Sequence, residues 1–155
     1  MLKRYSQSEE DYLEAIYLIE LKNKVVRVKD VAESVGVTMP SVVSAIRSLS
    51  EKGLVEQEQY GHIELTLKGR KVARDVYERH KTLYTFFHQF LGLEAAIAEK
   101  DACLMEHHLS PETRQRLLKV LEYVQGCEEV LFLERLWHFI ETGDRLGPCS
   151  GCGVK

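Results

Sequence analysis

The stretch that decides the fold is "VRVKDVAESVGVTMPSVVSAIRSLSEKGLV", residues 26–55. Helical spacing of its apolar residues predicts a short helix over about residues 29–35, which Gly36 would end. A second helix would follow, with Thr38 at its N-cap and Gly53 at its end. Two helices joined by a tight turn that contains a glycine have the layout of a helix-turn-helix. The inner face of the second helix would consist of Val42, Val43, Ile46 and Leu49.

The residues that come next predict a small β-hairpin. "LVEQEQYGHIELT", residues 54–66, alternates apolar and polar side chains around Gly61, which is the pattern of two short strands. A helix-turn-helix followed directly by a two-stranded hairpin is a winged helix. Order, spacing and local charge favour that interpretation over a helical repeat that carries a hairpin.

Helices are expected on both sides of the winged helix. A capping-box pattern from Ser8 to Asp11 predicts a first helix, with apolar residues at Leu13 and Ile16. Thr66 would cap a long helix, and Ser110 a later one whose first residue is a proline. We therefore predict a mainly α protein, with an N-terminal winged helix-turn-helix followed by an all-helical dimerisation domain. The later helices are expected over residues 66–90, 94–108, 111–124 and 128–141.

The two halves of the chain differ in charge. Residues 22–74 contain ten Lys and Arg against six Asp and Glu, whereas residues 94–144 contain five against eleven. The basic half suits nucleic-acid phosphate, and the acidic helical half offers apolar faces for a two-fold dimer interface. We predict a DNA-binding domain over residues 1–75, a helical domain over 76–143 and a flexible tail over 144–155.

The composition also excludes several classes of protein. No apolar run approaches the length of a membrane span, and "MLKRYSQSEEDY" at the N-terminus turns acidic where a signal peptide needs an apolar stretch. Four cysteines in 155 residues do not indicate a disulfide framework. These features predict a cytoplasmic protein that does not enter a membrane.

A cluster of metal-binding residue types lies in "DACLMEHHLS", residues 101–110. Positions i, i+3 and i+4 of a helix share a face, so Cys103, Glu106 and His107 are expected to point the same way. Thiolate, imidazole and carboxylate together suit a divalent transition metal. The first helix adds two carboxylates at i and i+3, and the long helix adds an imidazole. These further candidates are Asp11, Glu14 and His80.

At this point the chain resembles the metal-dependent repressors typified by the diphtheria toxin repressor and the manganese transport regulator MntR. The resemblance covers roughly residues 6–125 and lies in five stretches in the same order. The chain resembles the short form of the family, which has no SH3-like domain. The matching stretches are "EEDYLEAIYLIE" (9–20), the opening stretch (26–55), "GHIELTLKGRKVA" (61–73), "RH" (79–80) and "DACLMEHHLS".

The resemblance implies a metal site and leaves its metal open between Fe(II) and Mn(II). Asp11 and Glu14 match ligands of the manganese-type members, whereas iron-type members have methionine at the position of Asp11. Cys103 matches a cysteine of the iron-type members and a glutamate of the short manganese regulator. One or two ions per chain are expected, with Glu99 and His108 as candidates for a second site. The implied ligands of the first site are Asp11, Glu14, His80, Cys103, Glu106 and His107.

The residues that would meet DNA follow from the helix-turn-helix. The N-terminal end of its second helix meets base edges, and the small residues there suit thymine methyl groups and backbone hydrogen bonds. Basic residues nearby suit phosphate. A homodimer on a palindromic operator in double-stranded DNA is expected, and the resemblance implies repression of metal-uptake genes. The candidates are Thr38, Pro40, Ser41 and Ser44 for bases, and Lys29, Arg47, Lys68 and Arg70 for phosphate.

Two other functions compete with this one. A metalloenzyme with Glu106 as general base is disfavoured, since the chain has no HExxH motif and its candidate ligands flank a DNA-binding unit. We therefore expect that the chain is not an enzyme. A winged-helix redox or thiol sensor would use Cys103, or Cys149 and Cys152 of the tail. Its DNA affinity would follow thiol oxidation and ignore a metal chelator.

Overall fold

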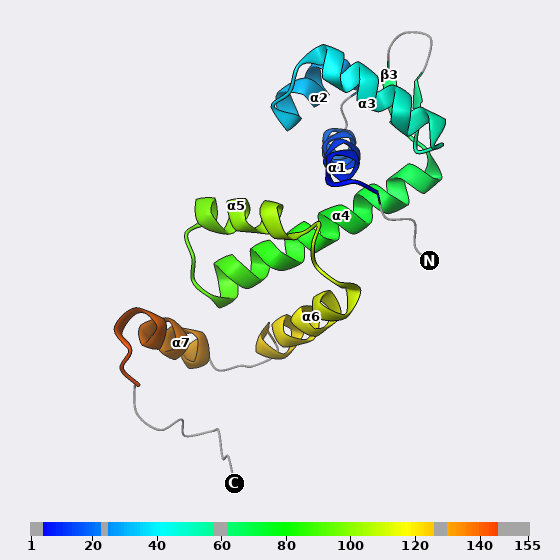
Figure 1. Cartoon of the computed structure of the whole chain (residues 1–155). Helices are drawn as coiled ribbons and strands as arrows, with labels where there is room; N and C mark the ends of the chain where they lie inside the picture. Colours follow the sequence, from blue (N-terminus) through cyan, green and yellow to red (C-terminus); the bar gives the residue numbers. More distant parts are fainter. Residues whose placement is uncertain (1–4, 23–24, 58–61, 126–129, 146–155) are drawn as a thin grey trace. The chain divides into compact units, whose positions relative to one another are not determined.

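The computed structural model of the chain describes residues 5–22, 25–57, 62–125 and 130–145 (Figure 1). The chain divides into two compact units, residues 1–80 and 81–155. The mainly α architecture with a small sheet is the predicted one. The predicted tail lies outside the described residues from position 146 onward, together with Cys149 and Cys152.

Helix α1 (Gln7–Leu21) begins two residues earlier than the sequence pattern indicated. Ser6 is the N-cap, because its hydroxyl accepts the N–H of Glu9 and the Glu9 carboxylate accepts the N–H of Ser6. The capping box predicted at Ser8 is therefore wrong. The apolar positions are confirmed, since Leu13 and Ile16 are fully buried in the core of the first unit.

The helix-turn-helix is formed by α2 (Val28–Val35) and α3 (Met39–Glu51), which pack on α1 and on each other (Figure 1). Gly36 ends α2 with a φ of 75°, a left-handed conformation that glycine adopts without steric cost. The buried face of α3 contains Val42, Ile46 and Leu49, as predicted. Val43 was wrongly placed there: it lies one residue, or about 100°, around the helix from Val42 and is 54% exposed.

The wing is a three-stranded antiparallel sheet rather than a simple hairpin. Strands β2 (Val55–Gln57) and β3 (His62–Leu65) pair as predicted, with Val55 opposite Leu65. The predicted turn residue Gly61 lies outside the described residues. A short strand that the sequence did not predict, β1 (Val26–Arg27), pairs with the other edge of β3 and gives the order β1-β3-β2.

Helix α4 (Leu67–Thr85) starts at the predicted cap, where the Thr66 hydroxyl accepts the N–H of Gly69 at 3.0 Å. The first turn of α4 passes close to the end of the helix-turn-helix. A Cβ added at Gly69 would lie 2.8 Å from the carbonyl carbon of Leu54 and would collide with its oxygen. Because glycine has no Cβ, the first turn of α4 can lie directly against the backbone of Leu54.

Gly69→Ala is expected to destabilise the first unit, because the atom that it meets belongs to the backbone and cannot move aside alone. Overpacking of this kind costs about 1–3 kcal/mol. Urea unfolding followed by circular dichroism measures the loss, and the exposed Lys71→Ala on the same helix is the control. Equal midpoints for the two variants would contradict the close approach.

The second unit begins at the C-terminal end of α4. A π-helical turn, η1 (Phe86–Phe90), extends the helix to the predicted end, and the Trp137 indole N–H donates to the Phe90 carbonyl at 2.9 Å. Helix α5 (Ala95–Met105) ends three residues before the predicted limit, because Glu106 and the residues after it form a turn. Ser110 caps α6 (Pro111–Gln125) as predicted, and the last helix is α7 (Val130–Thr142).

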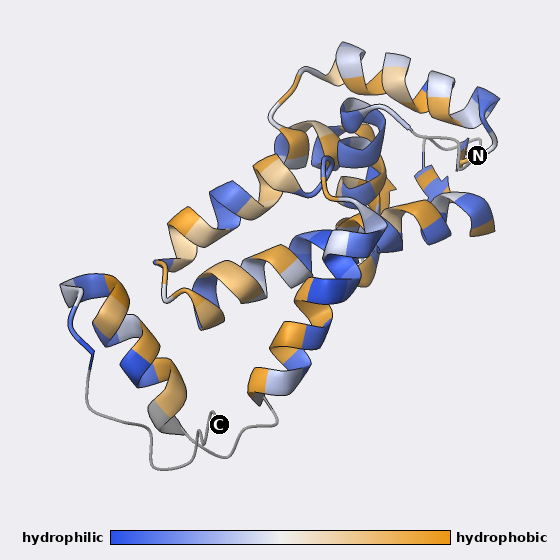
Figure 2. Cartoon of the chain, turned by 60° about the horizontal axis from the view of Figure 1, so that its bottom comes forward, coloured by the Kyte–Doolittle hydropathy of each residue, from blue (hydrophilic) through white to orange (hydrophobic). Residues whose placement is uncertain are grey.

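The helices of the second unit are amphipathic. Figure 2 shows apolar and polar residues alternating along the helices of the chain rather than gathering in one apolar stretch. Within the described residues, no helix combines the length and the apolar character that crossing a membrane requires. Large apolar side chains nevertheless remain exposed on all three helices. They are Ile97, Leu104 and Met105 of α5, Leu118, Val120 and Tyr123 of α6, and Phe132, Phe139 and Ile140 of α7.

Candidate metal centre and nucleic-acid interface

The first unit brings a carboxylate of α1 beside an imidazole of α4. Asp11 and Glu14 are half-buried and stand one turn apart on α1, between the fully buried positions that hold the helix in the core. His80 is half-buried on α4, and ligand atoms of Glu14 and His80 lie within 4.8 Å of each other. Oxygen and imidazole nitrogen at this spacing fit two ligands of one divalent ion.

Two contacts between α1 and α4 flank the Glu14–His80 pair. The Arg79 guanidinium lies 3.0 Å from the Glu10 carboxylate, and both side chains are nearly buried. Arg79 also lies 3.5 Å from the carboxylate of Asp75, one turn earlier on α4. On the other side of Glu14 along α1, the rings of Tyr17 and Tyr77 pack with centroids 5.9 Å apart. The two contacts thus lie on either side of Glu14 along α1, and both precede His80 along α4.

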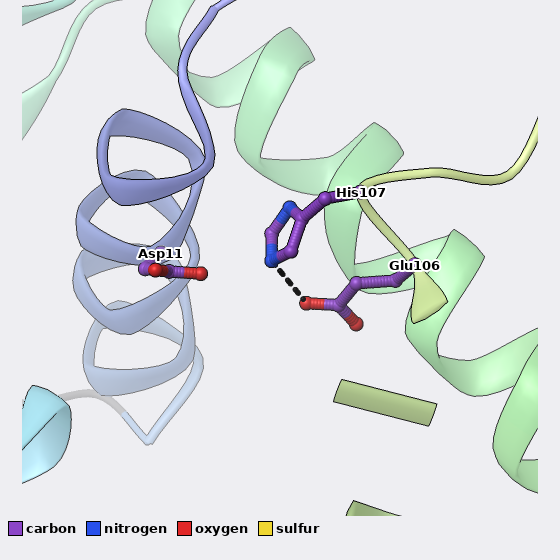
Figure 3. Close-up of side chains that lie close together, drawn as sticks. All are labelled: Asp11, Glu106 and His107. Carbon is purple, nitrogen blue, oxygen red and sulfur yellow. Dashed lines mark ion pairs between the residues drawn. The ribbon is translucent and has the colours of Figure 1, made fainter. Parts of the chain in front are cut away.

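The second unit contains a buried carboxylate and imidazole in adjacent residues. Glu106 is fully buried and His107 is 8% exposed, and Nε2 of His107 lies 3.2 Å from Oε1 of Glu106. Figure 3 draws this pair together with Asp11 of α1. Placing such groups out of water costs free energy unless they have partners of opposite charge or hydrogen-bonding character. A carboxylate and an imidazole offer a divalent cation one oxygen and one nitrogen ligand.

Cys103 differs from Glu106 and His107 in its surroundings. Its side chain is exposed, whereas those of the other two are buried. Helix α5 ends at Met105, and Glu106 at its C-cap still has helical backbone angles. Among the described residues, Cys103 is in none of the groups of three or more ligand atoms lying within 4.8 Å of one another.

Glu99 and His108, the candidates for a second ion, are both exposed. Within the described part of the chain, neither belongs to a group of three such ligands. The other candidates are Asp11, Glu14 and His80 of the first unit and Glu106 and His107 of the second. They offer only oxygen and nitrogen atoms, a donor set that fits Mn(II) or Fe(II) and does not require a thiolate.

The exposed face of α3 is the candidate DNA-reading surface. Pro40, Ser44 and Arg47 are exposed at spacings of four and three residues, which places them on one face. Val43 lies on that face, and the sequence interpretation missed it because it assigned every valine of this helix to the core. The spacing i, i+3, i+4 and i+7 from Pro40 is the signal that would have found it.

The N-terminal end of α3 is held by a hydroxyl pair. Thr38 occupies the N-cap position with extended backbone, but its side chain makes no capping bond to the backbone. Its hydroxyl instead lies 2.9 Å from that of Ser41. The predicted N-cap position is therefore confirmed, and the Thr38 hydroxyl contacts the neighbouring hydroxyl instead of a backbone N–H.

The four predicted phosphate-binding residues fall into two kinds. Lys29 and Arg47 are well exposed and make only one-turn ion pairs, with Glu33 at 3.6 Å and Glu51 at 3.4 Å. Such pairs are worth about 0.3–0.5 kcal/mol and exchange readily for phosphate.

Lys68 and Arg70, in contrast, contact other parts of the first unit. Lys68 donates to the Lys52 carbonyl at 2.7 Å. Arg70 lies 2.7 Å from Glu20, which also accepts the N–H of Leu65. At the other end of α1, Lys52 pairs with Glu9, and this ion pair lowers the pKa of the Glu9 carboxyl.

Comparison with known proteins shows which family the chain matches. A model described as the iron dependent repressor N-terminal DNA binding domain matches residues 4–63. A second, described as the iron dependent repressor metal binding and dimerisation domain, matches residues 66–131. Between them they account for most of the described residues.

Individual relatives agree with the family models. An uncharacterised HTH-type transcriptional regulator of Methanocaldococcus jannaschii is 38% identical over 118 residues, which cover 76% of this chain and 94% of that protein. The HTH-type transcriptional regulator MntR of Shouchella clausii is 32% identical, with 76% and 82% covered. None of these descriptions supports a cysteine-based sensor.

Solved structures of longer chains share the fold of this protein over part of their length. The manganese regulator SloR has 30% identity and a TM-score of 0.67, with 74% of this chain and 54% of that chain covered. IdeR of T. acidophilum has 26% identity and the same TM-score, with 76% and 55% covered. The chain thus spans about half the length of these solved proteins. By sequence, by both of its domains and by fold, it belongs to the iron-dependent repressor family, the metal-dependent transcriptional regulators typified by the diphtheria toxin repressor and MntR.

Proposed function

We propose that the chain is a homodimeric repressor of metal-uptake genes whose DNA binding is switched on by Fe(II) or Mn(II). The observation that carries the proposal is the pair of carboxylate–imidazole sets, Glu14 with His80 and Glu106 with His107, in a chain of this family. Carboxylate and imidazole side chains, which are suitable ligands for either metal, are thus present in the DNA-reading unit and in the helical unit.

We propose that these residues hold one shared ion. A bound divalent cation supplies a centre of positive charge for several carboxylates at once. Because the ligands come from both units, the arrangement in which they converge gains stability when they share the ion. Metal binding then raises the affinity for DNA that recognises this arrangement. DNA binding raises the affinity for metal by the same factor, about 5–150-fold for typical couplings. The proposed set is Asp11, Glu14, His80, Glu106 and His107, with Cys103 as a sixth ligand.

The identity of the metal depends on Cys103. The oxygen and nitrogen ligands favour Mn(II), and a thiolate shifts preference toward softer metals. Cys103→Glu should therefore favour Mn(II) over Fe(II), and we propose that the parent accepts both. A second ion, if bound, would use Glu99 and His108, which are exposed.

For DNA, we propose that each copy places α3 in the major groove of one half-site. Two copies related by a two-fold axis would then read a palindrome with half-sites about 34–36 Å apart. The exposed apolar residues of α5, α6 and α7 favour a second copy of the helical unit as the partner, because monomers rarely expose so many. The Lys29 and Arg47 side chains would contact phosphate.

Metal dependence is the test of this function. Duplexes selected from a random pool in the presence of Mn(II) serve as the probe, and fluorescence anisotropy measures their affinity anaerobically. We expect Mn(II) or Fe(II) to strengthen binding and EDTA to reverse the effect, in the parent and in Cys103→Ser alike. DNA binding that ignores both metal and EDTA would overturn the proposal. Affinity that follows thiol oxidation and disappears in Cys103→Ser would favour the thiol sensor.

A further inference from the structure

We propose that Arg79 and Glu10 are positioning residues for the metal ligands of the first unit. The inference rests on the proposed metal-dependent function, and it concerns residues to which no ligand role is assigned. Each member of the pair adjoins a proposed ligand in sequence: Glu10 precedes Asp11 on α1, and Arg79 precedes His80 on α4. The contact between them is therefore a direct link between the two ligand-bearing helices.

The geometry of the contact suits this role. Arg79 and Glu10 are joined at 3.0 Å, and their side chains are only 12% and 11% exposed. Asp75 holds the guanidinium from the same helix, so the side chain has a fixed direction. A guanidinium held at more than one edge positions its partner better than a flexible ammonium does. Arg79 thus fixes α1 at Glu10, one turn before the Glu14 ligand.

A second contact between these helices lies on the other side of Glu14 along α1. Tyr17 comes three residues after Glu14, and Tyr77 comes three residues before His80. The ion pair and the ring pair therefore lie on opposite sides of the Glu14–His80 pair along α1. With both contacts in place, ligand atoms of Glu14 and His80 lie within 4.8 Å of each other before metal binds. Without the ion pair, α1 could pivot about the tyrosines, and part of the binding free energy would be spent on closing the gap.

Charge and positioning predict opposite signs for one substitution. Arg79→Gln removes a positive charge beside a cation site, which would strengthen metal binding if only Coulomb's law applied. Loss of positioning would weaken it instead, by about 10–100-fold, as is typical for residues that orient metal ligands. Glu10→Gln weakens binding on either account. The sign of the Arg79 effect therefore separates the two explanations.

Calorimetric titration of the full chain with Mn(II) tests the inference, on the parent and on Arg79→Gln, Arg79→Lys, Glu10→Gln and the double variant. We expect both single glutamine variants to bind about 10–100-fold more weakly. The double variant should be no weaker than the worse single one, because both remove the same contact. Arg79→Lys should recover part of the affinity. Thermal unfolding in EDTA shows that each variant is folded.

Two control variants make the outcomes distinct. Val72→Ala lowers stability through the core packing of α4 and should keep the parent affinity for Mn(II). His80→Ala removes a proposed ligand and should abolish most of the binding. If His80→Ala weakens binding while Arg79→Gln binds equally or more tightly, the positioning role is overturned and the proposed function stands. If the parent and His80→Ala bind Mn(II) alike, both proposals are overturned.

Discussion

Replacing Glu106 with glutamine is expected to abolish the stabilisation that Mn(II) gives the protein, without destabilising the metal-free protein. Glu106 is fully buried beside His107 in the second unit. The amide has the shape of the carboxylate but no charge, so it is a poor ligand for a hard divalent cation. It also removes the desolvation cost of a buried charge. The substitution therefore separates metal binding from folding.

The size of the effect follows from linkage. A ligand at 100 times its dissociation constant stabilises a folded protein by about 2.7 kcal/mol. For a chain of this length that corresponds to a rise in Tm of about 5–10 °C. Differential scanning calorimetry of the parent should show this rise, and Glu106→Gln should show almost none.

The matched control is Glu112→Gln, which changes an exposed carboxylate at the start of α6. It should keep the metal-induced rise in Tm. A Glu106→Gln protein that responds to Mn(II) as the parent does would remove Glu106 from the proposed ligands. A large loss of Tm in EDTA would show instead that the charge of Glu106 supports the fold.

Val43→Asp should cause the largest loss of DNA affinity of any single change on α3. The side chain is 54% exposed on the same face as Pro40, Ser44 and Arg47. A carboxylate there would face phosphates and base edges, whereas valine offers methyl groups that suit thymine. A lost base contact costs about 1–3 kcal/mol, or about 10–100-fold per half-site. Two copies on one operator multiply this to about 100–10,000-fold.

Stability should change little in this variant, because exposed substitutions usually stay within about 0.5 kcal/mol. Fluorescence anisotropy with selected duplexes measures the affinity, and urea unfolding measures the stability. Val42→Ala provides the reverse control: it should lower stability through the core and leave the exposed face of α3 unchanged. DNA affinity of Val43→Asp equal to that of the parent would show that α3 does not read DNA through this face.

Much of the fold follows from local signals in the sequence. Gly36 ends α2, Thr66 and Ser110 cap α4 and α6, and the alternation after Gly53 gives β2 and β3. Each of these signals acts between residues a few positions apart. Where such signals repeat, as the hydroxyls at positions 6 and 8 do, the sequence could not choose between them, and the helix starts from Ser6.

Other features depend on contacts between distant residues. Strand β1 is two residues long and forms because Val26 pairs with Ile63, far along the chain. The exposure of Val43 depends on how α3 packs on α1 and α2. Strand β1 has no distinctive local pattern in the sequence.

For the candidate metal centre, the sequence by itself predicted which residues have the chemistry to bind a metal, namely Asp11, Glu14, His80, Cys103, Glu106 and His107. Only the tertiary structure decided that Glu14 and His80 lie within 4.8 Å and that the Glu10–Arg79 ion pair holds their helices together. The physical reason is the range of the interactions. Residue type and helical spacing are properties of a few consecutive residues, whereas the distance between two ligands on different helices is set by all the packing between them.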